Sequence, residues 1–188
     1  MNNNIQMVDL KTQYHHIKEE IDKAVINCIS STAFINGPAV KEFQISLEQY
    51  LGVKHVIPCA NGTDSLQIAM MALDLKPGDE VICATQDYDT VLASLRWLVA
   101  EKQVTVRPLQ LPANSSEQAL VQCYAETITP RTKLIVLSHL CHRHGQILPV
   151  AQISRMARKQ GVDVMVDAAH SFAQLDYQLP DLEADFIA

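Results

Sequence analysis

The sequence predicts an α/β fold in which a mostly parallel sheet carries helices on both faces. Short apolar runs alternate with helical segments along residues 55–188, which is typical of strand–helix–strand units. Those runs are rich in Val, Ile and Leu, a composition that favours strands buried on both faces. A chain of 188 residues that is 48% hydrophobic is also long and apolar enough to bury one full core.

The N-terminal part predicts two helices before this alternation begins. A helix is expected over residues 14–30, because apolar residues recur there on one helical stripe: Ile17, Ile21, Ala24, Val25 and Cys28. Asn36-Gly37-Pro38 favours a turn. A second helix is expected over residues 40–51, ending before Gly52. We therefore expect residues 1–35 to form a helical arm and residues 36–188 to form the main domain.

The remaining elements follow from the same patterns. Strands are expected over residues 55–60, 80–85, 104–109, 133–138, 162–166 and 184–188. Helices are expected over residues 63–75, 88–101, 115–127 and 150–159. Ser116 is a candidate N-cap of the third of these helices.

Composition excludes several classes of protein and partner. The formal net charge of −6 argues against nucleic acid and anionic membranes as partners. No apolar run approaches the roughly 20 residues of a membrane-spanning helix, and the N-terminus has no signal-peptide pattern. The five cysteines include no CxxC pair, which favours reduced thiols in a cytoplasmic protein.

Candidate binding residues follow the expected strands, because ligands of open α/β sheets bind beyond the carboxyl ends of the strands. Asn61-Gly62-Thr63 comes between an expected strand and an expected helix. Free N–H groups at such a helix start, together with the Thr63 hydroxyl and the open backbone of Gly62, suit a phosphate. The same residues also suit an ordinary turn in which Thr63 is the N-cap.

Three further side chains follow other strands. Tyr88 could stack on a flat cofactor or be one more residue of an amphipathic helix. Asp167 ends an apolar run, so its carboxylate needs a partner, which could be a protonated ring nitrogen of a ligand, an Arg or a helix start. His170 could contact the same ligand or lie on a loop.

The segment HLCHRH, residues 139–144, offers three His and one Cys as metal ligands. Their spacing matches no standard structural zinc site, and Gly145 follows directly, as in a simple turn. We therefore expect no metal at this segment.

A phosphate loop, an aromatic ring and an aspartate occur in that order at successive strand ends. This order resembles that of the fold-type-I pyridoxal-phosphate-dependent enzymes. Residues 8–81, including VDLKTQYHHIKEEID, INGPAVKEF and CANGTDSLQIAMMALDLKPGDEV, resemble the DegT-type sugar aminotransferases. Residues 85–188, including TPRTKLIVLSHLCHRHGQ, VDVMVDAAHSFAQ and LEADFIA, resemble the class V branch of cysteine desulfurases and isopenicillin-N-epimerase-like enzymes. Both branches share one fold.

The resemblance implies a cofactor, pyridoxal 5′-phosphate, and a role for each candidate residue. It makes Gly62 and Thr63 phosphate ligands and Tyr88 the ring that stacks on the pyridine. Asp167 would pair with the pyridinium nitrogen, and His170 would lie near the phenolic oxygen. His142 stands where the class V pattern often has Asn, near the cofactor and the substrate carboxylate.

Both branches hold their cofactor as a Schiff base on a lysine downstream of the aspartate, and residues 160–188 contain no lysine. The chain therefore resembles the front part of such an enzyme, with the C-terminal small domain absent and no identifiable catalytic residue. The resemblance implies an aminotransferase with a small-molecule amino donor and a keto acceptor. The resemblance of residues 8–81 implies that the acceptor is a sugar-nucleotide ketone. It also implies a homodimer. Because the Schiff-base lysine is missing, we expect this chain to be inactive.

Three alternatives stay open at this point. The first is a class V desulfurase or epimerase. The second is a binding or assembly module without catalysis. The third is a metal-dependent hydrolase that uses residues 139–144 with Asp167.

Overall fold

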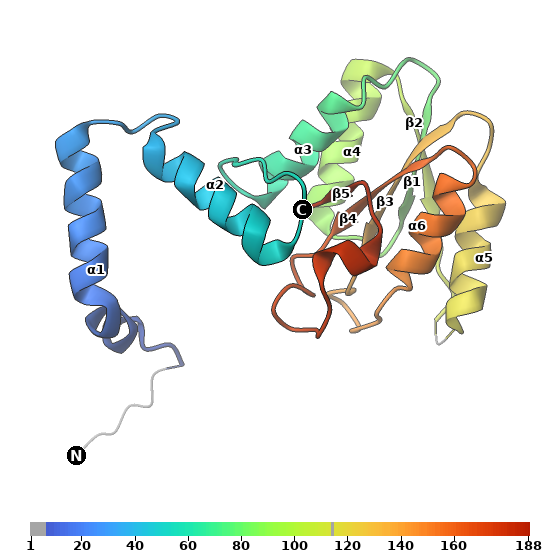
Figure 1. The fold of residues 1–188 in the computed structure, drawn as a ribbon. Coiled ribbons are helices and arrows are strands. Elements are labelled where there is room, and N and C mark those ends of the chain that lie inside the picture. Colours follow the sequence, from blue (N-terminus) through green and yellow to red (C-terminus); the bar gives the residue numbers. More distant parts are fainter. Residues whose placement is uncertain (1–6, 114) are drawn as a thin grey trace. The chain divides into compact units, whose positions relative to one another are not determined.

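The structure is a computed structural model that describes residues 7–113 and 115–188 (Figure 1). The chain divides into two compact units, Met1–Tyr50 and Leu51–Ala188. Each unit is described by itself below.

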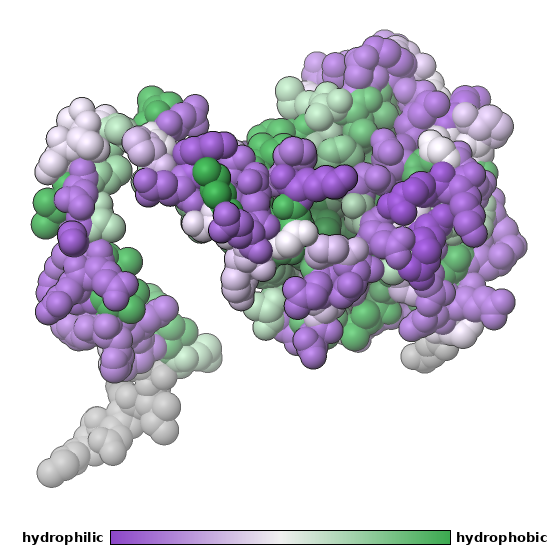
Figure 2. Space-filling view, viewed as in Figure 1, coloured by the Kyte–Doolittle hydropathy of each residue, from purple (hydrophilic) through white to green (hydrophobic). Residues whose placement is uncertain are grey.

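The first unit consists of two helices, α1 (Leu10–Ser31) and α2 (Pro38–Leu51, whose last residue belongs to the second unit). Both predicted helices are confirmed. Helix α1 begins four residues earlier than expected, because the Asp9 side chain accepts a hydrogen bond from the main-chain N–H of Thr12 at 3.0 Å and caps the helix there. Neither helix has a buried residue, and Figure 2 shows apolar residues at the surface of α1.

The turn between these helices depends on a glycine. Asn36 has a positive φ of 49°, and a Cβ placed on Gly37 would lie only 2.2 Å from the carbonyl oxygen of Ala33. No side chain fits that separation. The predicted turn at Asn36-Gly37-Pro38 therefore has a steric origin in the backbone.

The second unit is built on a parallel sheet. The described residues form strands β1 (Glu80–Ala84), β2 (Thr105–Leu109), β3 (Thr132–Ser138), β4 (Asp163–Asp167) and β5 (Phe186–Ile187). Their spatial order is β2-β1-β3-β4-β5, and every pairing is parallel. The predicted α/β class with a parallel sheet is confirmed.

Helices cover both faces of this sheet, as Figure 1 shows. They are α3 (Gly62–Ala72), α4 (Asp89–Lys102), α5 (Glu117–Thr127) and α6 (Val150–Arg158), and a short 3-10 helix, η1, spans Leu179–Leu182. Ser116 caps α5 as predicted, accepting from the N–H of Ala119 at 3.2 Å. Among the described residues, no helix has the length and apolar content needed to cross a membrane.

Alternate strand residues enter two separate cores. Val81, Val136 and Met165 pack with α3 and α4 on one face. Ile82, Ile135 and Val164 pack with α5 and α6 on the other. This alternation explains why the strand sequences are continuously apolar: both faces of each strand are removed from water.

One predicted strand is wrong. Residues 55–60 adopt no strand in the structure, and Ile57 is 72% exposed. The apolar, β-branched sequence of this segment has the composition of a strand, but a strand forms only where a neighbouring edge supplies hydrogen-bond partners. In the structure this segment is not part of the sheet β2-β1-β3-β4-β5.

A buried carboxylate joins three strands at the amino-terminal edge of the sheet. Glu80 is fully buried, and its Oε1 accepts from Nε and Nη2 of Arg131 at 3.0 and 2.6 Å. Its Oε2 accepts from the Thr129 hydroxyl at 2.6 Å and lies 3.6 Å from Nη1 of Arg107. The Thr129 hydroxyl, followed by Arg131, holds the pKa of Glu80 below its ordinary value.

Candidate active site

The candidate site is built on the carboxyl ends of three adjacent strands, where β1 ends at Ala84, β3 at Ser138 and β4 at Asp167. Ser138 and Asp167 are register partners. The segments that leave these three ends therefore start side by side at one edge of the sheet, which is the edge where parallel sheets bind ligands.

Asp87 is a buried carboxylate that ties two of these strand ends together. It is 2% exposed; its Oδ2 accepts from the N–H of Ala84 at 2.7 Å, and its Oδ1 accepts from the N–H of Ser138 at 2.9 Å. Burial, together with the nearby charge of Asp167, raises the pKa of Asp87 to about 6 against the opposing effect of these hydrogen bonds. Two carboxylates therefore influence each other at this edge.

Three rings lie together above the same edge. The Tyr88 ring meets the His142 ring edge-on, with centroids 4.9 Å apart, and lies 6.1 Å from the His170 ring. The rings of His142 and His170 are stacked at 5.9 Å with an interplanar angle of 20°. Tyr88, His142 and His170 come from three different segments, so the fold itself assembles this ring cluster.

The segment after β3 is held against the start of α4 by polar contacts as well. Arg143 Nη2 donates to Asp89 Oδ1 at 2.9 Å, and the Cys141 thiol lies 3.8 Å from the carbonyl oxygen of Gln86. Cys141 Sγ also lies 3.3 Å from Nε2 of His144. The two segments that carry Tyr88 and His142 are therefore fixed to each other.

Asp167 is half-buried at the end of β4, and a local turn fixes its carboxylate. Its Oδ1 accepts from the N–H of Ala169 at 3.0 Å. Its Oδ2 accepts no hydrogen bond from a described residue, so one carboxylate oxygen is available to an incoming donor. This geometry is suited to a protonated nitrogen.

Behind the strand ends, His139 connects β3 to the segment that follows Asp167. His139 is buried, and its Nδ1 lies 3.0 Å from the Ser171 hydroxyl, which in turn lies 2.9 Å from the Tyr177 hydroxyl. Burial lowers the pKa of His139. An uncharged imidazole therefore anchors the turn that carries His170.

Gly62 and Thr63 lie at the N-terminus of α3. Asn61, not Thr63, is the N-cap, because the Asn61 Oδ1 accepts from the N–H of Asp64 at 3.0 Å. The N–H groups of Gly62 and Thr63 have no acceptor among the described residues, and a Cβ on Gly62 would have no atom within 4 Å. Two free donors and open space thus lie at this helix start.

The structure therefore brings three of the six candidate residues into contact, and a fourth, Asp167, lies three positions before one of them in the sequence. Tyr88, His142 and His170 share a ring cluster, and Asp167 lies in the segment that leads to His170. No described contact joins Gly62 or Thr63 to those four, so their part in a common site stays a prediction.

Asp87 and His139 also follow strands that end at this edge, but sequence reasoning did not assign either of them to the cofactor site. A buried aspartate directly after an apolar strand was the available signal for Asp87, but its hydrogen-bond partner Ser138 is 51 positions away. No local pattern indicates such a partner.

The side chains of residues 139–144 point to different partners. His139 contacts Ser171, His142 contacts Tyr88, and Cys141 contacts His144. Among the described residues, no group of three His, Cys, Asp or Glu side chains is arranged to hold a metal ion.

The parallel sheet, its order and its two helical layers define the fold-type-I class of pyridoxal-phosphate-dependent transferases. More particularly, the chain belongs to the DegT/DnrJ/EryC1/StrS aminotransferase family, whose model matches residues 15–178. That match includes most of residues 85–188. The family indicates pyridoxal phosphate as the cofactor.

Individual proteins agree with this assignment. The chain is 38% identical over 168 residues to the UDP-2-acetamido-2-deoxy-3-oxo-D-glucuronate aminotransferase of Pseudomonas aeruginosa, covering 89% of this chain and 45% of the relative. A DegT/DnrJ/EryC1/StrS aminotransferase from Brucella abortus is 28% identical with a TM-score of 0.70, over 89% of this chain and 45% of that one.

The fold extends to a more distant enzyme. A C-DES variant with glycine covalently linked to its pyridoxal-phosphate cofactor is 24% identical with a TM-score of 0.69. The match covers 95% of this chain and 46% of that one. This chain thus spans a little under half the length of these proteins.

Proposed function

We propose that this chain is the cofactor-binding part of an aminotransferase that acts on a nucleotide-linked keto sugar. The observation that supports this most directly is the ring cluster of Tyr88, His142 and His170 beside Asp167, at the carboxyl edge of a parallel sheet. The name of the Pseudomonas relative supports the substrate class, since it specifies an oxo sugar carried on UDP.

The residues of this edge fit pyridoxal phosphate. We assign the phosphate to the free N–H groups of Gly62 and Thr63, where a helix start favours an anion. We assign the flat ring to the Tyr88 face, because aromatic stacking suits a planar heterocycle. Asp167 Oδ2 would accept from the ring nitrogen, and His170 and His142 would flank the ring.

The chemistry of this cofactor is to draw off the electrons released when a substrate Cα–H bond breaks. Asp167 contributes by keeping a proton on the ring nitrogen, since an adjacent carboxylate favours the charged form of the ring. His139 and Ser171 hold the following turn in place. Asp87 positions the ends of β1 and β3, and through them Tyr88 and the segment after Ser138.

Residues 160–188 contain no lysine, and Lys159 lies at the wrong end of β4 to reach Asp167. Lys159 ends α6 and is exposed, four residues before β4 begins at Asp163. Asp167 lies at the opposite end of that strand, about 13 Å further on at roughly 3.3 Å per residue. We therefore propose that this chain binds pyridoxal phosphate without a covalent bond and has no turnover alone.

Binding of pyridoxal phosphate to the 188-residue chain is expected to be reversible and to depend on Tyr88. Reduction with borohydride should leave no stoichiometric adduct in the intact mass, and dialysis should remove the cofactor. Tyr88→Ala should weaken binding about three- to tenfold, the equivalent of one aromatic contact. An absorbance titration measures both.

The matched control is Tyr50→Ala, which removes an exposed tyrosine from the first unit. It should leave the affinity unchanged. A single lysine labelled stoichiometrically after reduction would contradict non-covalent binding. Equal affinities for the Tyr88 and Tyr50 variants would contradict the role of the ring.

We also propose that the chain self-associates as a homodimer. The apolar face of α1 supports this, because Ile17, Ile21 and Val25 are each at least 42% exposed although their spacing is that of a packed helix. Sedimentation velocity at increasing concentration should show a dimer, and Ile21→Lys should shift the equilibrium toward monomer. A monomer at all concentrations would contradict this proposal.

A further inference from the structure

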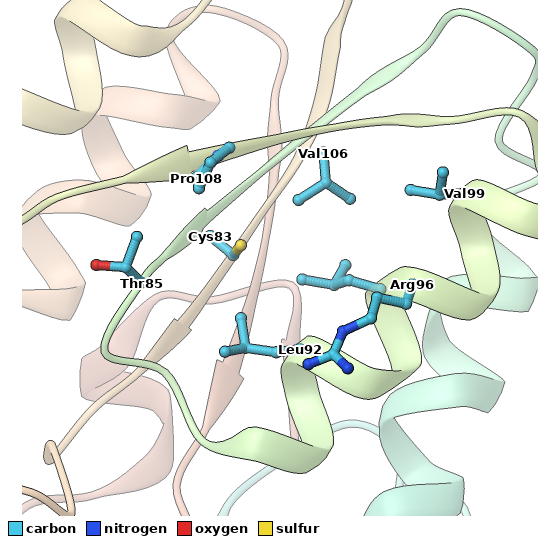
Figure 3. Close-up of a pocket in the computed structure, with 8 residues that line it drawn as sticks. Cys83, Thr85, Leu92, Arg96, Val99, Val106 and Pro108 are labelled. Carbon is cyan, nitrogen blue, oxygen red and sulfur yellow. The ribbon is translucent and has the colours of Figure 1, made fainter.

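A hollow lies on the α4 side of the sheet, between α4 and strands β1 and β2 (Figure 3). Its volume is about 270 Å³. Leu92 and Val99 of α4 face Cys83 of β1 and Val106 and Pro108 of β2 across it, with Thr85 at one end. Leu95 of α4 also lines the hollow. All of these residues belong to the second unit.

The hollow is lined almost entirely by apolar atoms. Leu95 and Cys83 are each 1% exposed, whereas Val99 at the mouth is 44% exposed. The Cys83 thiol stays uncharged at neutral pH, because burial raises its pKa to about 12. Binding of an apolar ligand in a concave apolar site is favourable, because the ligand displaces water from apolar surface.

One charged side chain lines this hollow. Figure 3 shows Arg96 extending from α4 beside Leu92. Arg96 is exposed, and it forms no ion pair or hydrogen bond with any described residue. Other arginines of the second unit, such as Arg131 and Arg143, contact carboxylates within the chain. The guanidinium of Arg96 is therefore free to pair with an anion from outside.

We propose that this hollow binds a small carboxylate whose apolar body lies between α4 and the two strands and whose anion pairs with Arg96. The size of the body follows from the volume: a cavity of about 150 Å³ holds benzene, so this hollow accommodates roughly ten non-hydrogen atoms. A phenyl ring with a short aliphatic acid chain has that size and that division of charge.

The test uses 3-phenylpropionate as the probe and 3-phenylpropan-1-ol as its neutral counterpart. Methyl-resolved ¹³C spectra of the 188-residue chain report the site directly, because Leu92, Val99 and Val106 carry methyl groups in its wall. We expect saturable shifts at these three residues, with the acid binding more tightly than the alcohol.

Arg96→Gln should weaken binding of the acid about three- to tenfold, as for the loss of one partly exposed charged contact. The same variant should leave the alcohol unaffected. Lys102→Gln, which removes a cation from the same helix outside the hollow, is the matched control and should leave both affinities unchanged. Val99→Phe should abolish binding of both probes by filling the mouth.

Two results would overturn the proposal: no methyl shifts at saturating probe, or an acid affinity that Arg96→Gln leaves unaltered. Methyl shifts that depend on protein concentration rather than on the probe would also overturn it, since they would assign the hollow to contact with a second copy. Asp167→Asn should not change binding of the acid, so this test is separate from the proposed cofactor site.

Discussion

Asp167→Asn is expected to lower the affinity for pyridoxal phosphate about 10- to 100-fold, which corresponds to the loss of one charge-assisted hydrogen bond. The carboxylate has one oxygen bound to the N–H of Ala169 and one oxygen free. An amide in its place cannot offset the positive charge of a protonated ring. An absorbance titration of the cofactor measures the change without requiring turnover.

Asp163→Asn provides the control on the same strand. Asp163 is the first residue of β4 and Asp167 the last, so the two substitutions make the same chemical change at opposite ends. We expect the Asp163 variant to bind with unaltered affinity. If both variants bound equally well, Asp167 would not contact the cofactor, and the assignment of this edge as the cofactor site would be wrong.

Glu80→Gln is expected to lower the free energy of unfolding of the second unit by about 2–3 kcal/mol at neutral pH. The buried carboxylate accepts three hydrogen bonds from Arg131 and Thr129. An amide reverses one of these contacts and removes the charge that Arg131 and Arg107 pair with. Urea unfolding followed by the fluorescence of Trp97, the single tryptophan, measures the difference.

The effect should depend on pH in a defined direction. Because the pKa of Glu80 is lower in the folded protein than its ordinary value of 4.5, its contribution is complete above that value. The contribution is lost as the pH falls through the folded pKa. The wild type and the Glu80 variant should therefore converge in stability at acid pH.

Glu101→Gln, an exposed change near the end of α4, should leave the stability nearly unaltered. A stability difference between the wild type and the Glu80 variant that persisted undiminished in acid would contradict the electrostatic explanation. It would point instead to a change in packing.

The elements that the sequence predicts best are the strands buried on both faces. Ile82, Ile135 and Val164 lie in one core and their neighbours in the other, so the whole strand must be apolar and is easily recognised. Segment 55–60 has a similar composition. Whether it forms a strand depends on pairing with a neighbouring strand, which its own residues do not specify. The helix capped by Asp9 begins four residues earlier than expected, and the helix capped by Asn61 begins one residue earlier.

The candidate site was predictable to the extent that it depends on chain topology. Tyr88 follows β1 and Asp167 ends β4 at the same edge, and the parallel order brings the segments after these strands together. The contact between Tyr88 and His142 depends on side-chain placement across 54 positions, which no local pattern specifies. Asp87 and His139 can be recognised as parts of the site only when their burial and their hydrogen-bond partners are known.

The contacts that join the start of α4 to the segment after β3 have a thermodynamic consequence. Arg143 with Asp89, and Tyr88 with His142, connect these two segments before any ligand arrives. A ligand that enters between such loops loses less affinity to the entropy of ordering them, because folding has already met that cost. Preorganisation of this kind explains how a surface assembled from three separate loops could hold a small cofactor in one orientation.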